Sequence, residues 1–253
     1  MGDDVPPNGP ETSAADAVGF YASLILSVTT VVTFALAITA IPISGANCPG
    51  NCVSYPYLDT LPQYPRDFVW MYFATLLMLV YLVFVAAIQA YAPETRKLYA
   101  MIAFAFSIVA AVVLVSVYYV QGYVVPASLM NAETDGLALL IQYNPHGVFI
   151  ALEELGYLVM SLSFLFLGLS FGHGDRLQSA VRWVFYCGFA AAALALVVFT
   201  AGYGLQRLDR LEVSLISVDW FVLVVNGLLL AVLFGRRRRR TQAFRHTSAF
   251  RSE

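Results

Sequence analysis

Six long apolar runs alternate with short polar segments along this chain. Because a bilayer core is about 30 Å thick, a helix needs roughly 20 consecutive apolar residues to cross it. Each run reaches that length, and prolines and polar residues stand between the runs, where helices begin and end. The pattern predicts an all-α polytopic membrane protein, a bundle of six transmembrane helices near residues 18–41, 68–91, 98–124, 148–171, 180–204 and 214–235.

The segments outside the helical domain of residues 18–235 are polar. Residues 1–17 carry acidic residues and prolines but no basic residue, so we expect a disordered tail rather than a secretory leader. Residues 236–253 are expected to form a basic tail. Within the domain, Pro126 is expected to end the third span, because a proline inside a helix removes a backbone hydrogen bond.

Composition agrees with a membrane protein. Apolar residues make up 60% of the chain and charged residues 12%, against about 25% charged residues in soluble domains. The one lysine, Lys97, lies at the start of the third span. No lysine is therefore available inside a span to form a Schiff base, which excludes rhodopsin-type chemistry.

The basic residues are divided unequally between the two sides of the membrane. One side has Arg96, Lys97, Arg176, Arg182 and the seven arginines from Arg236 to Arg251, and the other has Arg66, Arg207 and Arg210. Because cytoplasmic loops retain Lys and Arg, this positive-inside bias predicts cytoplasmic N- and C-termini in a plasma membrane. The loops at 42–67, 125–147 and 205–213 are then outside.

The first outside loop contains two cysteines, Cys48 and Cys52, separated by a Pro-Gly-Asn turn. In an oxidising location this arrangement predicts a structural disulfide. A redox-active dithiol is the alternative, although the CxxC spacing of oxidoreductases is absent.

The fourth span carries two adjacent carboxylates, Glu153 and Glu154, about two turns after Pro145. Ionised carboxylates inside a membrane are costly unless they are paired or protonated. We therefore expect a charged pocket on the outer side. Its other candidate charged members are Arg66, Asp67, Arg207, Asp209, Arg210, Glu212 and Asp219, and its further lining is expected from Trp70, Tyr72, Gln121 and His146. Three interpretations stay open: an interhelical ion-pair network, a ligand or ion site, and a catalytic acid or base.

The last span is followed at once by five arginines: Arg236, Arg237, Arg238, Arg239 and Arg240. Next to a membrane, such a run favours contact with anionic phospholipid over binding of nucleic acid. His173 and His246 have no second ligand at metal-binding spacing, so neither a metal site nor a cofactor is expected.

Two stretches, residues 64–72 (YPRDFVWMY) and 144–157 (NPHGVFIALEELGY), resemble small polytopic membrane proteins of bacteria and archaea that have no known activity. The resemblance covers the chain from the first span to the sixth. It implies a multi-pass protein of a bacterial or archaeal inner membrane, and it implies no ligand or catalytic residue.

The leading functional hypothesis is a non-enzymatic binding, sensory or accessory protein whose outer pocket takes a lipid-like small molecule or an ion. One alternative is a membrane enzyme acting on a lipid-like substrate, with Glu153 or Glu154 as acid or base and His146 assisting. Another is a small secondary transporter, which predicts a water-filled path from these glutamates toward Asn226. Small residues in the fifth span also leave a homo-oligomer or a protein partner open.

Overall fold

The fold comes from a computed structural model that describes residues 10–40, 42–172 and 174–249. All regular secondary structure in these residues is helical. The helices are α1 (Pro10–Ala37), α2 (Val69–Tyr91), α3 (Lys97–Tyr119), η3 (Val120–Val124, a π-helix), α4 (Val125–Met130), α5 (Leu137–Leu140), α6 (Val148–Ser170), α7 (Arg176–Tyr203) and α8 (Arg210–Ala249), with short 3₁₀ turns at Leu61–Gln63, Glu94–Arg96 and Gly204–Gln206.

Six helical segments are long and apolar enough to cross a membrane, which confirms the predicted number of spans among the described residues. They are Ala14–Ala37, Val69–Tyr91, Glu94–Met130, Val148–Ser170, Arg176–Gln206 and Arg210–Gln242. The third, fifth and sixth segments extend beyond the expected boundaries at both ends, and the first begins and ends four residues earlier than expected.

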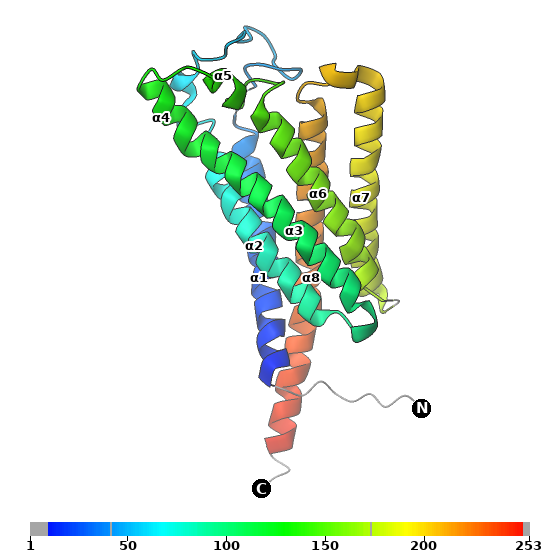
Figure 1. The fold of residues 1–253 in the computed structure, drawn as a ribbon. Helices are drawn as coiled ribbons and strands as arrows, with labels where there is room; N and C mark the ends of the chain where they lie inside the picture. Colours follow the sequence, from blue (N-terminus) through cyan, green and yellow to red (C-terminus); the bar gives the residue numbers. More distant parts are fainter. Residues whose placement is uncertain (1–9, 41, 173, 250–253) are drawn as a thin grey trace.

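The spans form a closed ring in chain order. α1 packs on α2, α2 on α3, α3 on α6, α6 on α7, α7 on α8, and α8 returns to α1, while α6 also contacts α8 across the ring. The start of α1 and the end of α8 lie at one end of the bundle, which we call the arginine end (Figure 1). The opposite end holds the loops between α1 and α2, around α5, and between α7 and α8, and we call it the disulfide end (Figure 1).

The expectation of a disordered tail over residues 1–17 is wrong for residues 10–17, because α1 begins at Pro10. Residues 1–9 lie outside the described residues. Asp16, a buried residue of α1, accepts an ion pair from Arg237 of α8 at 3.3 Å. The Arg237 guanidinium also lies 4.7 Å from the centre of the Tyr91 ring. These contacts explain why α1 starts early and why α8 continues through the arginine run.

The expectation that Pro126 ends the third span is also wrong. The helix passes from α3 through the π-helical turn η3 into α4, which contains Pro126. The wider π turn accommodates the proline ring, and the carbonyl of Gly122, four residues earlier, accepts a hydrogen bond of 3.0 Å from the Tyr72 hydroxyl. A side chain of α2 thus replaces the donor that the proline lacks.

The predicted disulfide is confirmed, since Cys48 and Cys52 are bridged. The segment before the bridge is held to the α7–α8 connection by Asp209. Its carboxylate accepts hydrogen bonds from the Ala46 backbone N–H at 2.6 Å and from the Asn47 side chain at 3.0 Å. The disulfide loop therefore has a fixed place over the bundle.

Candidate functional site

A cavity of about 420 Å³ lies at the disulfide end, and we call it the outer cavity. Its wall comes from the end of α1, the segment 42–47, the starts of α2 and α8, and residues 142–150 before and within α6. The most exposed parts of this wall include Ile38, which follows α1 directly, and Val213 of α8, at 67% and 43% exposure. The cavity is therefore open on the side where α1 and α8 meet.

Aromatic rings form much of the wall. Trp70 and Trp220 pack edge to face with ring centres 6.3 Å apart, and Phe34 packs on Trp220 at 6.0 Å. Tyr143 and Phe149 complete the aromatic lining. Four of these rings are buried and Phe34 is partly exposed, so the interior is apolar and its shape is set by large, rigid side chains.

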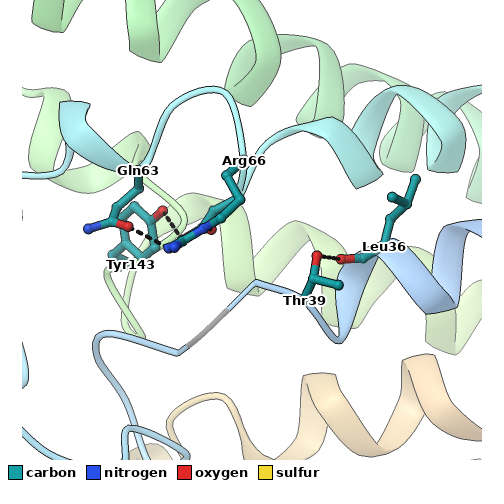
Figure 2. Close-up of polar contacts among 6 residues, drawn as sticks. Leu36, Thr39, Gln63, Arg66 and Tyr143 are labelled. Atoms are coloured by element: carbon teal, nitrogen blue, oxygen red, sulfur yellow. Dashed lines mark hydrogen bonds and ion pairs between the residues drawn. The ribbon is translucent and has the colours of Figure 1, made fainter.

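Asp67, at the start of α2, is the first of three acidic residues in the wall. Arg66 Nε lies 2.6 Å from its Oδ1, and the Tyr143 hydroxyl donates to Oδ2 at 3.4 Å. Gln63, Arg66 and Tyr143 meet beside this carboxylate (Figure 2). In the same view, Thr39 donates to the carbonyl of Leu36 in the last turn of α1. Burial, with Asp67 beside it, raises the pKa of the Tyr143 phenol, so it stays a neutral donor.

Glu212 is the second acidic residue of the wall, in the first turn of α8. Only 8% of the residue is exposed, and it forms no hydrogen bond or ion pair with a described donor. The side-chain neighbour that the structure gives it is another carboxyl, that of Glu153. Asp209, already placed under the disulfide loop, is the third acidic residue of the wall.

Glu153 lies behind Glu212 and does not itself line the outer cavity. It is fully buried, and its Oε1 accepts a hydrogen bond of 2.7 Å from Tyr118. Tyr118 also bonds to Tyr157 at 2.8 Å, and Tyr157 accepts from the Trp220 indole at 3.0 Å. A continuous polar chain therefore leads from Glu153 back to an aromatic residue of the cavity wall.

Glu154 turns to the other side of α6, as expected for adjacent helix positions. Arg207 donates to it through two guanidinium nitrogens, Nε to Oε1 at 3.1 Å and Nη2 to Oε2 at 2.5 Å. These hydrogen bonds raise the pKa of Arg207. Of the sequence-predicted residues, this pair is the one that the structure joins as an interhelical ion pair.

Asp219 lies deeper on α8 and is fully buried. Ser161 of α6 donates to its Oδ1 at 2.7 Å, while its Oδ2 has no partner among the described residues. The next polar position, Asn226, is also buried without a described partner. Glu212, Asp219 and Asn226 follow one another at intervals of seven residues, so they share one buried face of α8.

The remaining candidates lie apart from the glutamates. Arg66 pairs with its neighbour Asp67, and Arg210 lies over the Tyr203 ring at 4.4 Å. His146 is exposed and is not part of the cavity wall. The expected charged pocket is therefore divided into an Arg207–Glu154 pair, an Arg66–Asp67 pair and a buried carboxyl group around Glu153 and Glu212.

The site has members that sequence reasoning did not identify as cavity residues. Tyr143 and Phe149 carry no charge and lie near a turn. Their sequence positions therefore gave no signal that they belong to a cavity wall. Trp220 is buried between α1, α2 and α6, where its ring packs on Phe34, Trp70 and Tyr157. Asp67, Trp70, Asp209 and Glu212 were expected in the pocket, and all four line the cavity.

A second hollow lies at the arginine end between α1 and α8, with a volume of about 600 Å³, and we call it the arginine groove. Its apolar wall includes Phe20, Leu24 and Leu228, and its polar wall is made by Arg236, Arg238, Arg239 and Gln242. Arg237, held by Asp16, is not part of it. Among the residues that the structure describes, no group of three or more metal-ligating side chains is present.

Comparison of the chain with protein-family models, with curated proteins and with solved structures finds no match. The likeness of residues 64–72 and 144–157 to small polytopic proteins therefore stays a prediction.

Proposed function

We propose that this protein is a non-enzymatic binding protein of the plasma membrane that takes a small amphiphilic molecule into the outer cavity. The observation that carries this proposal is the cavity itself, about 420 Å³ of mostly apolar and aromatic lining with a few buried polar groups. Ligand pockets have this character and a volume of about 300 to 1,000 Å³. The opening between α1 and α8 gives an amphiphile a route from the surrounding lipid.

The orientation is part of the proposal. The excess of Arg and Lys at the arginine end supports a cytoplasmic location for both termini and an external location for the cavity. Labelling in intact cells tests it, using a Cys187→Ser background so that Cys48 and Cys52 supply the thiols. After treatment with a membrane-impermeant reductant, an impermeant maleimide should label the chain. Labelling that requires cell lysis would overturn this orientation.

Binding is favoured over catalysis by the surroundings of the two glutamates. The enzyme hypothesis needs an accessible carboxylate beside His146. Glu153 is fully buried, Glu154 is engaged by Arg207, and neither forms a described hydrogen bond with the His146 side chain. The transporter alternative needs a water-filled path that passes Asp219 and reaches Asn226. Spectroscopic detection of water at Asn226 would favour this alternative.

Tryptophan fluorescence provides the test of binding, because Trp70 and Trp220 line the cavity and Trp183, the third tryptophan, is exposed on α7. In a Trp183→Phe background, octanol, octyl sulfate and octyltrimethylammonium are titrated separately below micelle formation. At least one probe should give a saturable change. Ser217→Phe places a large ring on the cavity wall and should abolish the fluorescence change. Ser116→Phe, on the exposed face of α3, should preserve the fluorescence change. No saturable response to any probe would reject the proposal.

A second proposal concerns the arginine groove, which we infer binds the headgroup and one acyl chain of an anionic phospholipid. Three arginines beside an apolar channel match a negative headgroup joined to a hydrocarbon chain. Native mass spectrometry with phosphatidylglycerol and phosphatidylcholine tests this match. Retention of both lipids to the same extent would reject it.

A further inference from the structure

We propose that the ligand of the outer cavity is an organic cation of the alkylammonium type, with its charged group against Glu212 and its apolar part against Trp70 and Trp220. This inference rests on the proposed binding function, and it adds the sign of charge and the chemical class of the ligand. Three independent features of the cavity carry it: the charge of the wall, the unpaired state of Glu212, and the aromatic lining.

The described wall of the cavity contains three acidic residues and no lysine, arginine or histidine. The arginines of the disulfide end are directed elsewhere: Arg66 binds Asp67, Arg207 binds Glu154, and Arg210 lies over Tyr203. An anionic ligand would therefore meet carboxylates without a basic residue in the wall to balance its charge. A cation would meet complementary charge.

Two of the three carboxylates already have partners. Asp67 is balanced by Arg66, and Asp209 accepts hydrogen bonds from the Ala46 backbone and the Asn47 side chain. Glu212 has no cation and no N–H donor beside it among the described residues, and its neighbour is the carboxyl of Glu153, although Glu212 is more than nine-tenths buried and belongs to the wall. It is therefore the group with which an incoming ligand can pair.

The carboxyl behind it strengthens this assignment. Glu153 faces Glu212, and Glu153 Oε2 has no described hydrogen-bond partner. Two buried carboxyls in contact cannot both be ionised without compensation, so they need a shared proton or a cation. A cation at Glu212 would supply this compensation from the cavity side.

The aromatic rings favour an organic cation over a metal ion. Ca²⁺ requires six to eight oxygen ligands, and the described part of the chain contains no group of three metal-ligating side chains. Faces of Trp and Tyr instead attract alkylammonium groups through cation–π interactions. Trp70, Trp220 and Tyr143 line the same cavity as Glu212.

The three octyl probes test the inference, because they share a chain and differ in charge. In the Trp183→Phe background, octyltrimethylammonium should bind at least about tenfold more tightly than octanol or octyl sulfate. Glu212→Gln should reduce its affinity about tenfold, Glu212→Asp should restore most of the loss, and Glu133→Gln, an exposed control at the same end, should have no effect. Thermal unfolding checks that each variant is folded.

The outcomes separate this inference from the proposed function. Equal affinity for all three probes, with loss of binding in Ser217→Phe, would keep the binding function and overturn the assignment of charge. Tighter binding of octyl sulfate would also overturn it. If Glu212→Gln does not fold, the order of the three probes on the parent protein still decides the question. An absence of binding by every probe would reject both proposals.

Discussion

Arg207 and Glu154 form a two-point ion pair that ties the α7–α8 connection to α6, with Nε 3.1 Å from Oε1 and Nη2 2.5 Å from Oε2. The arginine side chain is 26% exposed and the glutamate side chain 8%. Such a bidentate pair fixes the orientation of both planar groups. It holds Glu154 away from the outer cavity and stabilises the α7–α8 connection that carries Asp209.

Removing the arginine from this pair should destabilise the protein. Arg207→Gln leaves a nearly buried carboxylate without its cation, and we expect the free energy of unfolding to fall by about 2 kcal/mol. The double variant Arg207→Gln with Glu154→Gln should lose less than the sum of the single losses, because no unpaired charge is left. Thermal unfolding in detergent measures all three variants. Strictly additive losses would show that the pair contributes no coupling.

The position of Gly45 predicts a second effect, on the disulfide loop. Gly45 has a positive φ of 73°, and a Cβ added there would lie 2.7 Å from Asp209 Oδ1. Gly45→Ala should therefore displace Asp209, loosen the loop over the cavity and weaken octyl-probe binding severalfold. Gly136→Ala, where φ is 75° and a Cβ meets no atom within 4 Å, is the matched control. Unchanged probe affinity in Gly45→Ala would contradict the role of this loop as a cavity wall.

The hydrogen bond between Tyr72 and Gly122 predicts a coupling with Pro126. Tyr72→Phe removes the side-chain donor from the Gly122 carbonyl, to which Pro126 cannot donate because it has no N–H. The expected loss in the free energy of unfolding is about 1 kcal/mol. In the Pro126→Ala background the same change should cost much less, because the backbone N–H at position 126 is restored. Unfolding curves of the four proteins test this cycle. The same loss in both backgrounds would mean that Tyr72 acts independently of the proline.

The number of spans was readable from the sequence because hydrophobic length alone determines it. Boundaries failed where tertiary contacts override a local signal. Pro126 is a helix breaker in isolation, yet a π turn and Tyr72 on another helix accommodate it. Likewise, Asp16 and Arg237 lie in segments with no apolar signal, and their pairing across two helices extends both α1 and α8.

The candidate site was predicted only in part for a related reason. Local sequence identifies Glu153 and Glu154 as unusual, but the partner of each depends on the rotation of α6 and on which helix lies beside it. In the folded bundle, Glu154 faces Arg207, whereas Glu153 faces Tyr118 and Glu212. The aromatic wall was harder to predict, because buried and interfacial aromatics have the same local sequence pattern in a membrane protein.

The five arginines of the final run should divide between structural and lipid-binding roles. Arg237 pairs with buried Asp16 and stacks on Tyr91, whereas Arg238 and Arg239 belong to the arginine groove. Arg237→Gln should lower the free energy of unfolding by about 1 kcal/mol, since its side chain is partly exposed. Arg240→Gln, on an exposed side chain outside the groove, should change stability little.

Lipid retention should follow the opposite order among these variants. Each of Arg238→Gln and Arg239→Gln should weaken phosphatidylglycerol binding about fivefold, from roughly 1 kcal/mol of attraction per arginine. Arg237→Gln should weaken it less, because that guanidinium already interacts with Asp16. Native mass spectrometry and thermal unfolding on the same samples distinguish the two roles. Equal loss of lipid from Arg237→Gln and Arg239→Gln, with unchanged stability in both, would show that the run acts only as a diffuse positive surface.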